Sequence, residues 1–230
     1  MPARQSISSR KRVGQVRRSA RKPDKRSSKF ERRIGAESSK TRALLLEAAE
    51  RLMREEGYAA VTSRRLATKA GLKRQLVHYY FRTMDDLFLA LWRRYAEKIL
   101  LRQAQALSSS QPLHALWDHS SDAWDTSLYT EFCALANHRK AIRAELAQTG
   151  DRYRTMQLRA LAQIVEDYGL ESTVESPDAL TMLITSVPRI LVMEAQLGIS
   201  GGHELTMRLA ERWLARLEGP RGRPATKRKA

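Results

Sequence analysis

Hydrophobic residues recur at helical spacing along the chain from about residue 39 onward. The first series occupies positions that share one face of a helix with 3.6 residues per turn. It consists of Leu44, Leu45, Ala48, Ala49, Leu52 and Met53. Gly57 follows as an expected C-cap, because glycine adopts the left-handed backbone of that position without a steric cost. The pattern therefore predicts an amphipathic helix that begins near Ser39 and ends before Gly57.

Two short helices and a long one are predicted next. The pattern indicates a helix at 63–70, a turn at Gly71 and a second helix at 73–81. Thr83, with Asp86 three residues later, resembles a capping box in which Asp replaces Glu. This box is expected to open a long helix to about residue 107.

The remainder of the chain also has the pattern of helices. The expected ranges are 112–126, 128–137, 139–168, 177–198 and 203–217. Their borders carry proline or glycine, which end or begin helices. Pro188 lies inside one of them and is expected to kink it. No strand alternation and no internal repeat is evident, so we predict an all-α protein.

Positive charge is concentrated at the two ends of the chain. The net charge is +17, of which residues 1–40 contribute 14 Lys and Arg against 3 Asp and Glu. Residues 219–230 carry five basic side chains and no acidic one. We predict a disordered basic tail at 1–37 and a second basic tail at 219–230. This asymmetry is typical of a protein that meets a polyanion from one end, although tails that serve only solubility are the alternative.

Cysteine content and hydropathy bear on the compartment. Cys133 is the single cysteine, which excludes a disulfide within the chain and a cysteine-based metal cluster. No apolar run approaches the roughly 18–20 residues of a membrane span. The basic N-terminus lacks the apolar stretch of a signal peptide. We expect a cytoplasmic protein, associated with the nucleoid, that has no membrane partner.

The two short helices around Gly71 have the form of a helix-turn-helix. Apolar positions for their mutual contact are Leu66, Ala67, Ala70, Leu72, Val77 and Phe81. The side chains expected to face outward from the second helix are Lys73, Arg74, Gln75, His78 and Tyr79. Arg reads guanine and Gln reads adenine in the major groove. The pattern alone leaves a second interpretation open, an ordinary helical hairpin with a solvated polar face.

The start of the first short helix carries groups suited to phosphate. Thr62, Ser63 and Arg64 offer hydroxyls, free backbone amides and a positive charge. They therefore complement the outward face of the second helix as a candidate DNA surface.

A family resemblance favours the DNA-binding interpretation. Residues 41–95 resemble the N-terminal domain of the tetracycline-repressor (TetR/AcrR) family of bacterial regulators through TRALLLEAAERLMREEGY, AAVTSRRLATKAGL and KRQLVHYYFRTMDDLFLAL. The most specific part is the aromatic cluster at 78–81 followed by Asp85, Asp86 and Leu87. The rest of the chain matches the family in helical layout only.

The resemblance implies roles for individual residues. It implies that Thr62, Ser63 and Arg64 contact the DNA backbone or an adjoining base, and that Tyr79 packs on phosphate. It further implies that base edges are met by Lys73, Arg74, Gln75, Leu76 and His78. Leu76 is apolar and suits a thymine methyl group.

The chain departs from the family pattern at two positions. Many relatives carry a phosphate-binding Lys where this chain has Met84, which leaves Arg82 or a basic tail as a substitute. His78 replaces a more common Tyr and leaves the base preference open.

The C-terminal tail contains a second candidate for DNA contact. Arg221, Gly222 and Arg223, with a proline on each side, resemble the core of an AT-hook. In that motif Arg-Gly-Arg lies in the narrow minor groove of A·T-rich DNA. A nonspecific basic tail is the alternative here, and the N-terminal tail is expected to attract the duplex through charge.

The resemblance also implies a ligand cavity and a two-fold dimer interface in the C-terminal helices. The residues predicted to line an apolar pocket are Trp117, Trp124, Tyr129, Cys133 and Met156. A mostly apolar small molecule would suit them, and ordinary bundle core is the alternative. The dimer is expected to form through the apolar faces of the last two helices, from each subunit. Those faces carry Leu180, Leu183, Ile184, Val187, Leu191 and Ala195, then Leu205, Leu209, Trp213 and Leu217.

Catalytic and metal-binding motifs are not evident. Asp118, His119 and Asp122 lie close together in sequence but lack a metal-ligand spacing. No glycine-rich phosphate loop or nucleophile elbow is present. We therefore expect no cofactor and no enzymatic activity.

The sequence thus predicts an all-α regulator with four parts. These are the tail 1–37, a three-helix helix-turn-helix domain at 38–84, a ligand-binding and dimerisation domain at 85–218, and the tail 219–230. The predicted function is that of a homodimeric transcriptional repressor that a small molecule releases from a palindromic operator in double-stranded DNA. The alternative from another class is a DNA-architectural protein whose tails dominate binding.

Overall fold

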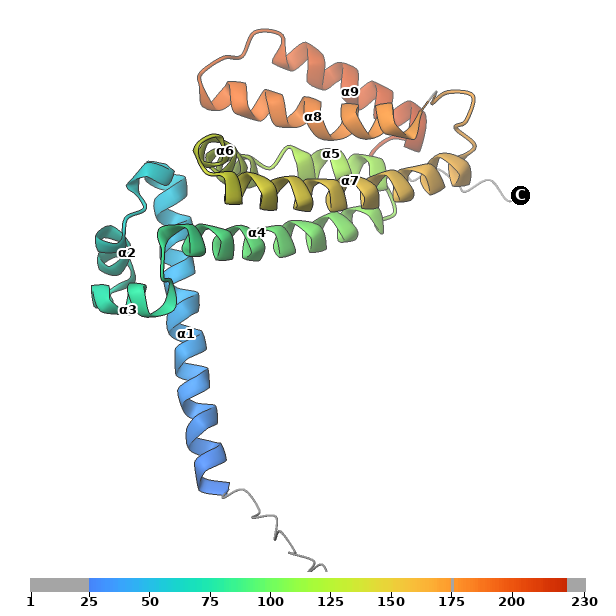
Figure 1. Cartoon of the computed structure of the whole chain (residues 1–230). Helices are drawn as coiled ribbons and strands as arrows, with labels where there is room; N and C mark the ends of the chain where they lie inside the picture. Colours follow the sequence, from blue (N-terminus) through green and yellow to red (C-terminus); the bar gives the residue numbers. More distant parts are fainter. Residues whose placement is uncertain (1–24, 175, 223–230) are drawn as a thin grey trace, which may run out of the picture. The chain divides into compact units, whose positions relative to one another are not determined.

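Helices account for the regular structure of this chain. The computed structural model describes residues 25–174 and 176–222 (Figure 1), and no strand occurs among them. The elements are α1 (Lys25–Glu56), the 3₁₀ turn η1 (Tyr58–Ala60), α2 (Ser63–Ala70), α3 (Arg74–Tyr80), α4 (Met84–Leu107), α5 (Pro112–Ser120), α6 (Ala123–His138), α7 (Lys140–Tyr168), α8 (Pro177–Gln196) and α9 (His203–Glu218). The all-α prediction is confirmed.

Helix α1 begins at Lys25, well before the start that the hydrophobic pattern predicts near Ser39. The apolar repeat is absent from this added segment, but so is proline, and the segment is rich in Lys, Arg and Glu, which have good helix propensity. Part of the tail predicted at 1–37 is therefore helical, and residues 1–24 lie outside the described part. The chain divides into two units between Lys40 and Thr41, and the second unit is described below.

The first hydrophobic core of the second unit joins the helix-turn-helix to the body. Buried side chains from α1, α2, α3, α4 and α6 pack together in it, among them Leu45, Leu66, Val77, Leu91 and Phe132. Residues on both sides of position 84 share this core. The boundary predicted between the domains 38–84 and 85–218 therefore does not separate two hydrophobic cores.

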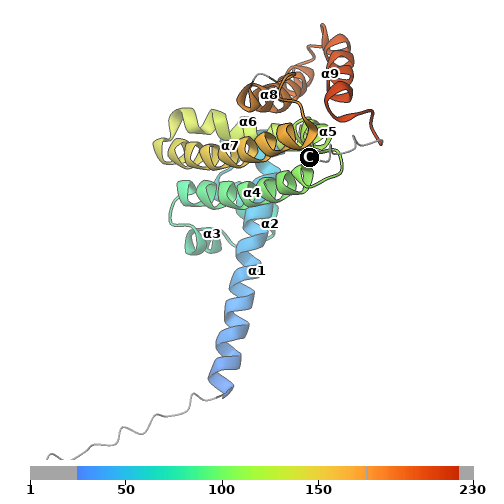
Figure 2. The same ribbon diagram turned by 90° about the vertical axis from the view of Figure 1, so that its right-hand side faces the viewer.

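A second core lies in the C-terminal half. It contains Leu116 of α5, Leu161 of α7, Ile184 of α8 and Leu214 of α9. Figures 1 and 2 both show α4 alongside α7 and α8 alongside α9. Residues from each of the helices α4 to α8 line one cavity, which is described below.

Local capping explains where several helices begin. The capping box predicted at Thr83 is present, since the Thr83 side chain accepts from the Asp86 amide at 3.1 Å and the Asp86 carboxylate accepts from the Thr83 amide at 2.9 Å. The helix predicted at 112–126 instead ends at Ser120, and α6 begins after Asp122, whose carboxylate accepts from the Asp125 amide at 3.1 Å. Helix α8 continues through Pro188 without ending.

Candidate DNA-binding surface and ligand cavity

Helices α2 and α3 form a rigid pair through their turn and their buried face. Gly71 has a left-handed φ of 66°, and the Leu72 amide donates to the Ala67 carbonyl at 2.9 Å across the turn. A side chain at position 71 meets no neighbour, but an L-residue with this backbone is strained. Leu66 and Val77 anchor the two helices in the first core.

The nine residues predicted to contact DNA gather on the exposed side of this pair. Seven of them are exposed, namely Thr62, Arg64, Lys73, Arg74, Gln75, His78 and Tyr79. Ser63 and Leu76 are half-buried. The Thr62 hydroxyl caps α2 by accepting from the Arg65 amide at 3.3 Å, and Arg74 Nε donates to Ser63 Oγ at 3.2 Å. The phosphate candidates on α2 are thus joined to the base-reading candidates on α3.

Charge on this surface is uncompensated. In the described part of the chain, no carboxylate forms an ion pair with Arg64, Lys73 or Arg74. The neighbouring Arg65 and Lys69 differ, because they pair with Glu56 and Glu55 at the end of α1. The free positive charge therefore lies on the side of α2 and α3 that faces solvent.

Met84 occupies the position at which the family resemblance leads one to expect a phosphate-binding Lys. Met84 begins α4 and packs against the first core, so it offers no charge to solvent. Arg82, two residues earlier, is exposed. Its exposure leaves the expected phosphate contact of Arg82 a prediction.

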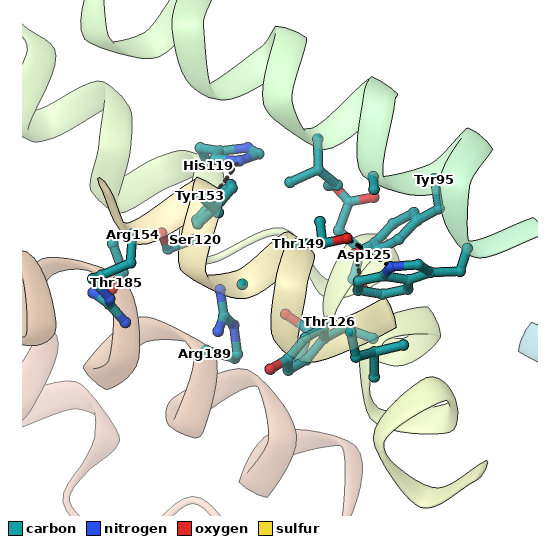
Figure 3. A pocket seen from close by; sticks show the side chains of 16 residues that line it. Tyr95, His119, Ser120, Asp125, Thr126, Thr149, Tyr153, Arg154, Thr185 and Arg189 are labelled. Carbon is teal, nitrogen blue, oxygen red and sulfur yellow. Dashed lines mark hydrogen bonds between the residues drawn. The ribbon is translucent and has the colours of Figure 1, made fainter. Parts of the chain in front are cut away.

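A cavity of about 160 Å³ lies among α4, α5, α6, α7 and α8 (Figure 3). Its aromatic walls are Trp92, Tyr95, Tyr129 and Tyr153. The Trp92 indole N–H donates to Thr149 Oγ1 at 3.1 Å, and the Tyr95 hydroxyl donates to the Asp125 carbonyl at 2.9 Å. Burial raises the pKa of Tyr95 and that of Tyr153, the latter to about 12. The walls are therefore uncharged at neutral pH.

The cavity also contains basic and hydroxyl side chains. Arg154, Arg189, His119, Ser120, Thr126 and Thr185 line it. The His119 ring is hydrogen-bonded to the Tyr153 hydroxyl at 3.3 Å. Burial and the nearby Arg102 and Arg189 lower the pKa of His119 to about 4, against a smaller opposing effect of Asp122. His119 is thus neutral at pH 7.

The half-buried His119 makes the free energy of unfolding depend on pH. An unfolded histidine binds its proton near pH 6.5, so between pH 6.5 and 4 the unfolded state binds more protons and the free energy of unfolding falls as the pH falls. We expect a loss of about 1–2 kcal/mol over this window, with allowance for solvent screening of a partly exposed ring. Thermal unfolding of the wild type and of His119→Gln at pH 7 and pH 4.5 measures it. The wild type should lose more stability than the variant; equal losses would contradict a neutral His119.

The five residues predicted to line the pocket do not converge. Tyr129 lines the cavity, and Cys133 is hydrogen-bonded to Tyr129 beside it. Trp117 lines a separate groove with α8 and α9, and Met156 lies in a shallow groove on the surface of α7. Trp124 is 60 % exposed, and the Arg54 guanidinium lies 4.3 Å from its ring centroid. Trp117, Trp124 and Met156 therefore do not contribute to this cavity.

Sequence reasoning missed the residues that give the cavity its chemistry. Tyr95, Tyr153, Arg154 and Arg189 come from three helices, and no spacing along the chain relates them. One signal was available: Arg189 is the single charged residue in the segment 179–193 of an otherwise apolar helix. A charged side chain in such a position suggests a buried functional group.

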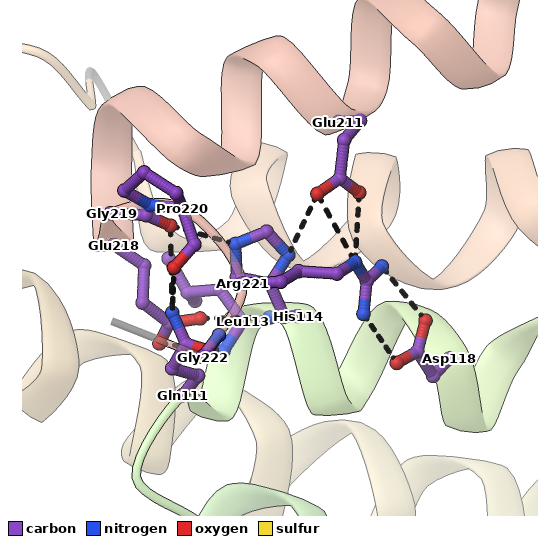
Figure 4. Close-up of polar contacts among 10 residues, drawn as sticks. All are labelled: Gln111, Leu113, His114, Asp118, Glu211, Glu218, Gly219, Pro220, Arg221 and Gly222. Carbon is purple, nitrogen blue, oxygen red and sulfur yellow. Dashed lines mark hydrogen bonds and ion pairs between the residues drawn. The ribbon is translucent and has the colours of Figure 1, made fainter. Parts of the chain in front are cut away.

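The C-terminal residues predicted as a minor-groove motif lie partly on the body of the protein (Figure 4). Arg221 donates to both carboxylate oxygens of Asp118 at 2.7 and 3.0 Å, and to Glu211 at 3.0 Å. These carboxylates, Asp118 first, raise the pKa of Arg221. The Gly222 amide donates to Gln111 Oε1 at 2.8 Å, and Arg223 lies outside the described residues. Contact of Arg221 with DNA would require both ion pairs to break.

No group of three or more metal-ligating side chains occurs in the described ranges. In the same ranges, no helix is long and apolar enough to cross a membrane.

An exposed basic helix-turn-helix on an all-helical body defines a DNA-binding regulator, and known proteins agree. Residues 45–91 match the family model of bacterial regulatory proteins, tetR family. The HTH-type transcriptional repressor BepR of Brucella suis is 27% identical over 140 residues, which cover 58% of this chain and 67% of BepR. Residues 45–91 are therefore a DNA-binding domain of the tetR family, and the chain is a DNA-binding transcriptional regulator.

Solved structures share the fold over most of the chain. A TetR transcription regulator from Haloarcula marismortui aligns with a TM-score of 0.63 and 22% identity, over 78% of this chain and 98% of that one. A transcriptional regulator from Saccharomonospora viridis in complex with choline aligns with a TM-score of 0.64 and 20% identity, over 77% and 96%. The C-terminal helices, which the family model does not cover, therefore have the same arrangement as in these regulators.

Proposed function

We propose that the protein is a homodimeric repressor that binds a palindromic operator through α2 and α3 and is released when a small molecule occupies the cavity. The observation that carries the proposal is the exposed, uncompensated surface of Arg64, Lys73 and Arg74. A major groove accepts a helix with such side chains, which donate to base edges and phosphates. The protein acts by binding and not by catalysis.

Exposed apolar side chains on α8 and α9 support a dimer. They are Met182, Leu183 and Ile190 of α8, Leu197 directly after it, and Leu205, Met207 and Leu209 of α9, each at least 48 % exposed. A groove that Trp117 and Trp213 help to line lies along the same helices. A second copy related by a two-fold axis would cover this surface with its own α8 and α9. The dimer then spaces two α3 helices for successive major grooves, about 34–36 Å apart.

Helix α4 supplies a route from the cavity to the DNA surface. Trp92, Tyr95 and Ile99 on α4 line the cavity, and the same helix begins at Met84, with three residues between it and the end of α3. Phe81 between them is buried in the first core. A ligand that favours one position of α4 therefore also favours one position of α3, which changes affinity for the operator. The choline complex of the Saccharomonospora regulator shows that a protein of this fold binds a small molecule.

A second candidate function is that of an architectural DNA-binding protein, which the net charge of +17 favours. Selection of binding sites from random duplex DNA at near-physiological salt separates the two functions. The repressor is expected to select a two-fold-symmetric motif with half-sites about one helical turn apart. A diffuse A·T-rich preference that weakens steeply with salt would instead favour the architectural function.

Arg74→Ala tests base reading by α3. We expect a loss of about 1–3 kcal/mol, or about 5–150-fold in affinity, on the selected operator and a much smaller loss on random DNA. Fluorescence anisotropy with both duplexes at one salt concentration measures the two losses. Arg159→Ala, which removes an exposed charge from α7, is the control and should change neither affinity by more than the error. Equal losses on the two duplexes would exclude Arg74 from base reading.

A further inference from the structure

The cavity contains two arginines whose charges no side chain balances. Arg154 of α7 and Arg189 of α8 line it, and neither forms an ion pair within the part of the chain that the structure describes. Arg189 lies over the Tyr129 ring, with its Cζ atom 4.9 Å from the ring centroid. Arg102 differs, because it pairs with Asp125 and thereby neutralises the carboxylate at the cavity wall. The cavity is therefore net positive.

Two hydrogen-bonding atoms at one end of the cavity have no partner. They are Arg154 Nη1 and Ser120 Oγ, which are buried from solvent and form no hydrogen bond within the described residues. In the view of Figure 3, Arg154, Ser120 and Thr185 lie on one side of the pocket and Thr126 on the other, with Arg189 of α8 between them. Buried donors are normally satisfied. This end thus fits a ligand group that only accepts hydrogen bonds and carries negative charge.

The other end of the cavity has a different character. The polar atoms of Trp92 and Tyr95 already donate to Thr149 and to the Asp125 carbonyl, so these rings offer their apolar faces to a ligand. Trp92 and Tyr129 lie close, with ring centroids 6.5 Å apart. The volume of about 160 Å³ corresponds to one aromatic ring, since an engineered cavity of about 150 Å³ in another protein accommodates benzene.

We propose that the cavity binds a single-ring organic carboxylate. Its ring packs against Trp92 and Tyr129. Its carboxylate accepts hydrogen bonds from Arg154 and Ser120, and Arg189 adds a second positive charge. Arginine suits this role because its planar fork matches the two carboxylate oxygens. The inference rests on the proposed ligand-released function and names the chemical class of the ligand.

The same observations argue against a cationic ligand. A quaternary ammonium, such as the choline bound by the Saccharomonospora regulator, would lie beside Arg154 and Arg189 without a free carboxylate to receive it. His119 adds no charge of either sign at pH 7, because burial lowers its pKa to about 4. Aromatic walls alone would accept a cation, so it is the two arginines that favour a ligand of negative charge.

The test is calorimetric titration of the full-length protein at pH 7 with benzoate, benzyl alcohol and choline. Benzyl alcohol has the ring without the charge, and choline has the opposite charge. We expect benzoate to bind at least tenfold more tightly than either. Arg154→Gln and Arg189→Gln should each weaken benzoate binding at least tenfold, whereas Arg152→Gln, on the exposed side of α7, should leave it unchanged. Circular dichroism of each variant establishes that it is folded.

Defined outcomes overturn the proposal. If benzyl alcohol or choline binds as tightly as benzoate, the carboxylate does not contribute to binding and the proposal fails. Benzoate that does not bind the wild type excludes the class. Benzoate affinity that survives both Arg154→Gln and Arg189→Gln excludes the assigned site, and the retained affinity of Arg189→Gln alone would exclude Arg189.

A second measurement separates this inference from the proposed function. Anisotropy with the selected operator, with and without saturating benzoate, reports ligand release directly. If benzoate binds with the expected dependence on Arg154 but leaves operator affinity unchanged, the carboxylate site stands and release by ligand fails. If benzoate does not bind while another compound releases the operator, the proposed function stands and the carboxylate site is excluded.

Discussion

Leu209→Arg is expected to convert the dimer to a monomer and to weaken operator binding by about two orders of magnitude or more. Leu209 is 61 % exposed on α9 and lines the apolar groove against α8. At a two-fold interface each subunit contributes one substituted residue, so two new positive charges enter the interface. Arg212 and Arg216 line the same groove, and the new charges are therefore repelled by them as well as by each other. A dimer holds its second recognition helix near the second half-site, which raises avidity by about 10²–10⁴-fold over a single site. A monomer loses this gain.

Leu101→Arg is the matched control for this substitution. Leu101 is 62 % exposed on α4, so the same chemical change occurs at equal exposure but away from α8 and α9. Sedimentation velocity gives the oligomeric state, and anisotropy with a full operator and with a half-site gives the two affinities. Leu209→Arg should lower affinity for the full operator and leave half-site affinity unchanged, whereas Leu101→Arg should alter neither. A Leu209→Arg protein that remains dimeric would remove α9 from the interface.

The helix-turn-helix was predictable because its signals are local. Thr83 and Asp86 are three residues apart, and Gly71 is followed at once by the residue that closes the turn. The apolar residues that hold α2 against α3 lie within one short stretch of sequence. The outward residues Lys73, Arg74, Gln75, His78 and Tyr79 follow from the same helical period, because they are exposed when Val77 is buried.

Helix boundaries were less predictable where a single side chain decides them. The predicted helix 112–126 continues the apolar period past Ser120, but the Asp122 carboxylate caps a new helix instead. At the other end of the chain, composition favours a free basic tail at 219–230. Arg221 nevertheless pairs with Asp118, which is more than one hundred residues away in sequence. Contacts of this range leave no periodic signal.

A cavity in the C-terminal helices could be expected from the sequence, but most of the residues that line it could not. The family resemblance implied a pocket, and the residues predicted to line it were mostly large and apolar. Trp124 instead faces solvent, where the Arg54 guanidinium covers its ring, and Trp117 faces the groove on α8 and α9. Which side of each helix faces the shared space depends on how five helices pack. The expectation of a mostly apolar ligand is therefore replaced by the proposal of a carboxylate, because the packing of the helices brings Arg154 and Arg189 to the same cavity.

Glu218→Ala is expected to lower the free energy of unfolding by about 3 kcal/mol. Glu218 is fully buried at the end of α9 and accepts hydrogen bonds from the Leu113 and His114 amides at 3.0 and 2.9 Å. These amides belong to the first turn of α5, which has no side-chain cap of its own (Figure 4). Burial raises the pKa of Glu218, while the two amides favour its charged form. Alanine leaves two buried donors without acceptors, at about 1–3 kcal/mol for each one left unsatisfied.

Thermal unfolding and urea titration measure the loss, which corresponds to a fall in Tm of about 6–12 °C for a domain of this size. Glu204→Ala on the same helix is the control, because Glu204 is exposed and pairs with Arg208 one turn away, so its loss should stay within about 0.5 kcal/mol. Glu218→Gln should lie between the two, since one acceptor oxygen remains but its amide nitrogen faces a backbone donor. If Glu218→Ala were as stable as Glu204→Ala, the carboxylate would not hold α5 to α9. Because His119 and Ser120 at the end of α5 line the cavity, benzoate affinity is also expected to fall in Glu218→Ala and to persist in Glu204→Ala.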